Sequence, residues 1–225
     1  MASLLGISSA SADTREEFWP ELDGFFKLDD RTRLFLMTSA TRGEDTESSN
    51  GSARYLSGEV GAHLDYTLRP FLRTDLREED WQHDRFLWLR AGYRHLEDFD
   101  DWGNGENRGL IELNAREPLA RGFSLTGRVK WELRDIDGQY SNRYGVRLGF
   151  ERPFSADGRA LVPYAQVESL YDTRFDTWYR RRYEAGIEFE VNKRWRVEPY
   201  IVHQDDSRSG SAHINALGLT LKYSR

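Results

Sequence analysis

The segment 122–135 alternates between two kinds of side chain, and this pattern constrains the fold more than any other feature of the chain. Successive side chains of a β-strand point to opposite faces, so the segment is expected to form a strand with one apolar and one ionic face. Such a strand is about as long as a tilted strand must be to cross a bilayer. The apolar or small set is Phe123, Leu125, Gly127, Val129, Trp131 and Leu133, and the polar set is Ser124, Thr126, Arg128, Lys130, Glu132 and Arg134.

Similar runs recur along the whole chain. Short connections alternate with longer polar ones, which is typical of a barrel with tight turns on one rim and loops on the other. We therefore predict an all-β fold, a transmembrane antiparallel up-and-down β-barrel. The eleven runs are 16–28, 31–41, 53–68, 84–96, 108–117, 122–135, 142–152, 159–172, 179–192, 194–204 and 212–223. The longer connections are 42–52, 97–107, 136–141, 173–178 and 205–211.

The number of strands is less clear than their existence. Residues 69–83 stand where a short turn belongs but form a segment of 15 residues. An odd count of eleven runs is also unusual, because single-chain bacterial barrels have an even number of strands. A further strand in or near 69–83 would give twelve strands, whereas merging or discarding one run would give ten. We predict 10–12 strands and prefer 12.

The composition agrees with a membrane barrel better than with a soluble globule. Only 38% of residues are hydrophobic and the mean hydropathy is −0.75, yet 13% are aromatic, so disorder explains the chain poorly. A barrel with a polar lumen resolves this conflict. No apolar run approaches the roughly 20 residues of a transmembrane helix. The net charge of −6 gives no reason to expect nucleic acid as a partner.

The two ends of the chain carry further indications of an envelope protein. Residues 1–12 resemble the end of a secretory signal, with Ala10 and Ala12 as a small-x-small cleavage site, so we expect a truncated signal peptide or disordered tail there and a single barrel over 13–225. Aromatic residues lie near the ends of the runs, where interfacial girdles occur. These are Trp19, Trp81, Trp102, Trp178, Trp195, Tyr140 and Tyr223.

The last run resembles the C-terminal signal by which the outer-membrane assembly machinery recognises barrels. Gly218, Leu221 and Tyr223 are the residues that carry this likeness, and Leu217 and Leu219 continue the same apolar face as Leu221. We therefore expect this machinery as a partner, together with the lipid bilayer and lipopolysaccharide.

Short motifs spread over residues 18–223 resemble, in their order and spacing, a family of uncharacterised bacterial outer-membrane β-barrels known only as a domain of unknown function. The resemblance implies a barrel in the bacterial outer membrane and brings no catalytic residues. The motifs are Gly92-Tyr93-Arg94, Asn142-Arg143 with Glu151, Pro163-Tyr164 with Glu168 and Tyr171-Asp172, Tyr183 with Gly186, Glu198-Pro199-Tyr200, His203-Gln204, and the terminus from Asn215 to Tyr223.

One stretch invites comparison with barrel enzymes that hydrolyse lipids. Outer-membrane phospholipase and lipid A deacylase have a His-x-Ser-Asn-Gly type motif near a strand end, whereas Ser207 here is four residues from His203 and no Asn-Gly follows. A serine and a histidine must meet within hydrogen-bond distance for the base to activate the nucleophile. Strand parity also places His203 on the lipid-facing side. An interfacial histidine is the preferred interpretation, and a lipid hydrolase remains the alternative.

No metal site or cofactor is expected from the sequence. The histidines at 63, 83, 95, 203 and 213 show no HxH or HExxH spacing, and there is no cysteine. The acidic loop 97–107 has ligands suited to calcium, but Trp102 and Gly103 break any EF-hand match. A solvated acidic loop is therefore preferred.

Charged residues of both signs alternate along the predicted inner face, which favours a salt-bridged lumen over a substrate path. We predict a narrow solute pore or an occluded structural barrel with little or no conductance, because 10–12 strands enclose less space than the roughly 16–18 of open porins. The candidate binding residues of the lumen are Arg128, Arg147, Glu168, Glu184 and Arg196.

Overall fold

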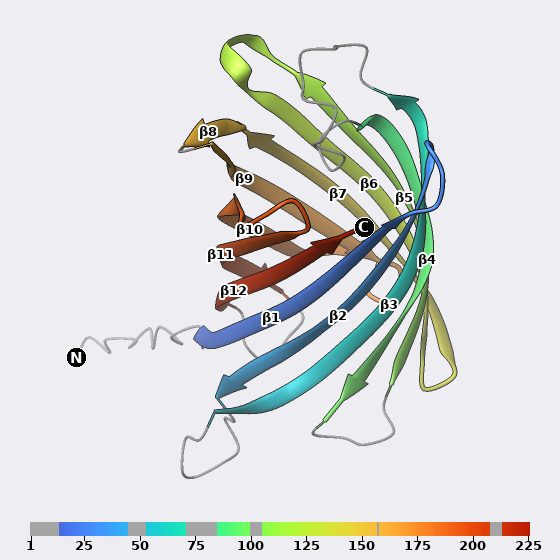
Figure 1. The fold of residues 1–225 in the computed structure, drawn as a ribbon. Helices are drawn as coiled ribbons and strands as arrows, with labels where there is room; N and C mark the ends of the chain where they lie inside the picture. The colour runs from blue at the N-terminus through green and yellow to red at the C-terminus, as the bar shows by residue number, and fades with distance from the viewer. Residues whose placement is uncertain (1–13, 45–52, 71–84, 100–104, 157, 208–212) are drawn as a thin grey trace, which may run out of the picture.

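In the computed structural model the chain folds into a closed β-barrel (Figure 1). The structure describes residues 14–44, 53–70, 85–99, 105–156, 158–207 and 213–225. No helix in these ranges is long and apolar enough to cross a membrane. The strands are β1 (Thr14–Lys27), β2 (Thr32–Glu44), β3 (Ala53–Pro70), β4 (Arg85–Asp98), β5 (Glu106–Pro118), β6 (Ser124–Ile136), β7 (Gln139–Glu151), β8 (Phe154–Ala156), β9 (Arg159–Asp172), β10 (Thr177–Glu190), β11 (Trp195–Asp206) and β12 (His213–Ser224), with one 3₁₀ turn at η1 (Ala120–Gly122).

Eleven of the strands form the ring, and each corresponds to one of the eleven runs expected from the sequence. Neighbours along the chain pair antiparallel, but β1 and β12 pair parallel, from Thr14 opposite His213 to Phe25 opposite Ser224 (Figure 1). An odd number of strands joined by reversing turns makes the first and the last run in the same direction, so the ring must close in parallel. The predicted all-β barrel of 10–12 strands is confirmed, with this one pair as the exception to antiparallel pairing.

The twelfth strand lies outside the ring. β8 pairs only with the first residues of β9, Arg159 to Leu161. The additional strand expected in or near 69–83 falls largely outside the described residues. The prediction of a longer connection at 136–141 is wrong. In the structure β6 and β7 are joined by a two-residue turn at Asp137 and Gly138, which have φ of 53° and 76°. Two residues with positive φ match the twist of a tight hairpin, so β6 and β7 extend up to this turn.

The two faces of the barrel are inverted relative to a soluble protein. Apolar side chains point outward, and Val129 and Leu148 on neighbouring strands are 57% and 54% exposed. Charged side chains point inward, and Glu112 and Glu132 are each only 2% exposed. This is the arrangement expected from the period-two alternation, with an ionic interior and an apolar exterior.

The aromatic residues at the strand ends are only partly placed as expected. Trp178 and Tyr140 are exposed on the outer face, and Trp195 packs there against Tyr223 with ring centroids 4.9 Å apart. Trp19 is instead in the lumen, where the Arg182 guanidinium lies 4.9 Å from its ring centroid. Trp19 belongs to the inward set of β1, so its place near a strand end does not make it part of an outer girdle. Trp81 and Trp102 lie outside the described residues.

Candidate functional site

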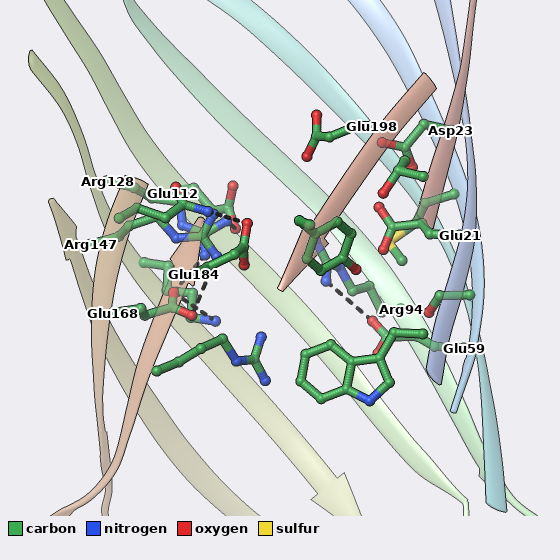
Figure 2. A pocket seen from close by; sticks show the side chains of 18 of the residues that line it. Glu21, Asp23, Glu59, Arg94, Glu112, Arg128, Arg147, Glu168, Glu184 and Glu198 are labelled. Atoms are coloured by element: carbon green, nitrogen blue, oxygen red, sulfur yellow. Dashed lines mark hydrogen bonds and ion pairs between the residues drawn. The ribbon is translucent and has the colours of Figure 1, made fainter. Parts of the chain in front are cut away.

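The lumen contains a cavity of about 800 Å³ (Figure 2). Four of the five predicted lumen residues line it: Arg128 on β6, Arg147 on β7, Glu168 on β9 and Glu184 on β10. The fifth, Arg196 on β11, also points inward but is buried against β10, where its Nη1 lies 2.8 Å from Glu188 Oε1. The alternation of the sequence therefore brings the expected residues to one interior.

Glu168 is the centre of an ion-pair cluster on one wall of the cavity (Figure 2). Its carboxylate lies 2.5 Å from Arg128 Nη2, 3.5 Å from Lys130 Nζ and 3.4 Å from Arg147 Nη2. Arg128 also faces Glu112 on β5, at 3.4 Å. These contacts connect four strands through side chains alone, because β5, β6, β7 and β9 each supply at least one group.

A second cluster follows the inner wall near the end where β5 begins and β6 and β9 end. Arg134 on β6 forms ion pairs with both Glu106 on β5 and Asp172 on β9. Arg108 joins the cluster through Glu106, at 2.6 Å, and reaches Glu59 on β3, at 3.2 Å. The cluster therefore links β6 to β9 past β7 and β5 to β3 past β4 on the inner face of the ring.

A third cluster fills the lumen beside β1 to β4, near the opposite rim. Asp65 is 0% exposed and accepts hydrogen bonds from Arg33 Nη2 at 2.6 Å and from Arg90 Nε at 2.7 Å. The Arg90 guanidinium lies 4.1 Å from the Phe35 ring centroid, and Phe35 stacks on Phe25 at 4.7 Å. Charged and aromatic groups pack together here and exclude solvent. Sequence patterning alone did not reveal Phe25 and Phe35 as inward-facing groups.

An acidic wall faces the Arg128 and Arg147 side of the cavity across the lumen (Figure 2). It consists of Glu21 and Asp23 on β1 and Glu198 on β11. Glu198 pairs with Lys222, but Glu21 and Asp23 have no basic group within 4.0 Å in the described part of the chain. Glu21 and Asp23 are not among the site residues expected from the sequence, although they follow the same alternation.

Tyrosine rings lie over glycines on the inner face of β9 to β12. Tyr200 pairs with Gly218, and a Cβ added to Gly218 would lie 2.0 Å from the tyrosine Cζ. Tyr164 similarly approaches Gly186, where an added Cβ would lie 2.8 Å from its hydroxyl oxygen. Only glycine leaves room for such rings. Of the C-terminal residues that resemble an assembly signal, Gly218 therefore faces the lumen, whereas Leu221 and Tyr223 belong to the outer set.

The outer face near the start of β12 contains the one convergence of potential metal ligands found among the described residues. His203, Asp205 and His213 offer ligand atoms that lie within 4.8 Å of one another. His203 contacts Asn215 and Asp205, whereas the Ser207 hydroxyl donates to the backbone carbonyl of Tyr179 at 3.2 Å. The Ser–His arrangement of a hydrolase is therefore not formed by this pair.

Comparisons with known proteins assign a family but no activity. The model of a family described as protein of unknown function (DUF2490) matches residues 16–215, and the chain therefore belongs to this family. The expected resemblance to an uncharacterised family is confirmed. No curated protein matches the chain. Among solved structures, LpxR from Salmonella typhimurium is similar with a TM-score of 0.46 and 9% sequence identity, over 85% of this chain and 83% of that chain.

Proposed function

We propose that this member of the DUF2490 family is an integral barrel of the bacterial outer membrane, without catalytic activity, whose ion-bridged lumen admits at most small polar solutes. The observation that carries the proposal is the inverted polarity of the closed barrel. Its outer face is apolar, while carboxylates and guanidinium groups such as those of Glu112 and Arg134 are buried inside.

The outer face supports the membrane location. The ring strands contain 12 to 18 residues, and a tilted strand needs only about 9–11 to cross a bilayer. Large apolar side chains are exposed on neighbouring strands, among them Ile111, Val129, Val146, Leu148, Ile201 and Leu217. In water such a surface would promote aggregation of the protein, whereas in a bilayer it contacts the apolar lipid chains.

The location is tested by purification and gel migration. We expect the folded chain to need detergent or lipid and to migrate differently on a gel before and after heating, as membrane barrels do. A monomer that stays soluble and monodisperse without detergent would show that the outer face is not in contact with lipid.

The interior supports a narrow or closed passage. Ion pairs join β3, β5, β6 and β9 near one rim, and Arg33, Asp65 and Arg90 fill the lumen near the other. Open porins use about 16–18 strands to leave an aqueous channel, and the ring here has eleven. The remaining cavity of about 800 Å³ has room for small hydrophilic molecules between charged walls.

Conductance in a planar lipid bilayer tests the state of the lumen. We expect the unaltered barrel to show unitary currents far below those of a general porin in the same bilayer. Arg134→Ala removes the link between Glu106 and Asp172 and should increase the current. Porin-sized currents from the unaltered barrel would refute the bridged lumen.

The alternative function, a lipid hydrolase, has its own test. Release of acyl chains from phospholipid or lipopolysaccharide, abolished by His203→Ala, would establish the hydrolase alternative instead.

A further inference from the structure

We propose that His203, Asp205 and His213 form a binding site for a late first-row divalent cation, with Zn²⁺ as the reference ion, on the outer face of the barrel. The site is separate from the lumen, because its three side chains are 48%, 42% and 39% exposed to the outside. The inference does not depend on whether the barrel conducts solutes.

The pairing of β11 and β12 brings the three ligands together. Asp205 lies opposite His213 in the antiparallel ladder, and His203 precedes Asp205 by two residues and so shares its face. Asp205 Oδ1 lies 3.2 Å from His203 Nε2 and 2.8 Å from His213 Nδ1. Metal–ligand bonds of about 2.0–2.1 Å place neighbouring ligand atoms roughly 2.9–3.4 Å apart. These two separations are close to those around a coordinated ion, and the ligand atoms of His203 and His213 lie within 4.8 Å of one another.

A chain of hydrogen bonds holds His203 in the orientation that a ligand requires. Asn215 Nδ2 donates to Glu16 Oε1 at 2.9 Å, and this directs the amide oxygen of Asn215 toward His203 Nδ1, at 2.8 Å. A carbonyl oxygen can only accept, so Nδ1 carries a proton, and in the neutral ring Nε2 then has the free lone pair. Metal-binding histidines characteristically have such a partner on the second ring nitrogen.

The lone pair of Nε2 then points at an acceptor. With both rings neutral, His203 Nε2 faces a carboxylate oxygen that cannot donate, and the second imidazole lies against the same oxygen. The lone pair of the neutral His203 Nε2 and the Asp205 carboxylate oxygen repel each other. A cation bound between them would attract both. Two imidazoles and one carboxylate suit zinc, copper or nickel, whereas calcium and magnesium prefer oxygen ligands. The exposed side leaves positions for water or an external ligand.

A similar group on β4 and β5 provides a matched control. His95 also contacts an asparagine and a carboxylate two residues away, with Nδ1 3.0 Å from Asn107 Oδ1 and Nε2 3.1 Å from Glu97 Oε2. It has the same kinds of hydrogen-bonding partner as His203. In the described ranges, however, no second histidine joins His95 and Glu97 to complete a set of three metal ligands.

The experiment is a titration of the folded, detergent-solubilised full chain, produced without a histidine tag, with Zn²⁺ by calorimetry. We expect one ion per chain, with affinity reduced at least tenfold by His203→Ala, His213→Ala or Asp205→Ala. Loss of a second-sphere partner typically costs about 10–100-fold, so Asn215→Ala should also weaken binding. His95→Ala should leave it unchanged, and excess Ca²⁺ should not compete. Heat-modifiable migration verifies that each variant is folded.

Cu²⁺ bound to the same protein provides a readout of the ligands themselves. Its electron paramagnetic resonance spectrum should show coupling to two imidazole nitrogens, and to one in His203→Ala. The proposal is overturned if Zn²⁺ does not bind the unaltered chain, if His203→Ala binds it as tightly, or if His95→Ala has an equal effect.

Discussion

Replacing Glu168 with Gln tests whether the ion pairs of the lumen are shielded from solvent. The substitution keeps the shape of the side chain but removes the charge that Arg128, Lys130 and Arg147 share. Glu168 is only 3% exposed, so water cannot readily replace it. Removing one partner of a buried ion pair typically costs about 3–5 kcal/mol.

The contacts that remain in the variant set the expected loss at the lower end of this range. Arg128 keeps Glu112 at 3.4 Å, and Lys130 keeps Glu132 at 3.2 Å. Arg147 has no other carboxylate within 4.0 Å in the described part of the chain, and it is left uncompensated. We therefore expect the free energy of unfolding to fall by about 3 kcal/mol.

Urea unfolding in lipid vesicles, followed by tryptophan fluorescence, measures this loss as a shift in midpoint at constant slope. Glu97→Gln is the matched control, because Glu97 pairs with His95 near a rim where both are partly exposed, and its loss should be below about 1 kcal/mol. Adding Arg147→Met to Glu168→Gln should restore part of the stability, since it removes the uncompensated charge. Equal effects of Glu168→Gln and Glu97→Gln would refute the reasoning and indicate that solvent screens the Glu168 ion pairs as much as the contact at the rim.

Three further predictions concern the strands and their turns. Gly218→Ala should reduce the heat-modifiable folded fraction, because the added methyl group would meet the Tyr200 ring. Tyr200→Ala in the same chain should restore the folded fraction, and Gly109→Ala, where the added methyl group has open space, should leave it unchanged. Tyr223→Ala should leave unassembled chain in the periplasm while deletion of residues 224–225 is tolerated, as fractionation of cells can show; the reverse result would mean that the outward set of β12 does not guide assembly. The Arg31 and Thr32 backbone N–H groups that donate to Asp29 at 2.7 Å and 2.8 Å hold the pKa of its carboxyl below the usual range. Asp29 therefore stabilises the fold above the usual aspartate pKa, and the difference in urea midpoint between the unaltered chain and Asp29→Ala should shrink as the pH falls through the lowered pKa.

Much of the barrel could be predicted because a strand has a period of two. Once Val129 is placed outside, Arg128 and Lys130 must lie inside, and each run fixes its own faces without knowledge of its neighbours. The same alternation places Arg147, Glu168 and Glu184 on the inner face of their strands, and in the structure they line one cavity although they belong to β7, β9 and β10. Local alternation is sufficient for these positions, because closure of the ring brings the inner faces of all its strands around one lumen.

Other features depend on relations that alternation does not contain. Phe25 and Phe35 are apolar but inward, because they pack against each other and under Arg33 and Arg90 inside the lumen. The parallel closure depends on the number of strands, which a local pattern cannot count. Convergence of Asp205 and His213 depends on the pairing between β11 and β12, and spacing along the chain does not reveal it.

The junction between β1 and β12 joins these separate features. Parallel pairs are slightly less stable per residue than antiparallel ones, so side-chain contacts across the junction gain importance. On the inner face, Gly218 lies between Trp19 on β1 and Tyr200 on β11, and its lack of a side chain makes room for the Tyr200 ring. On the outer face, Asn215 links Glu16 on β1 to His203 on β11. A cation bound by His203 would fix the orientation of Asn215 and so strengthen its bond to Glu16, which couples the proposed metal site to closure of the ring.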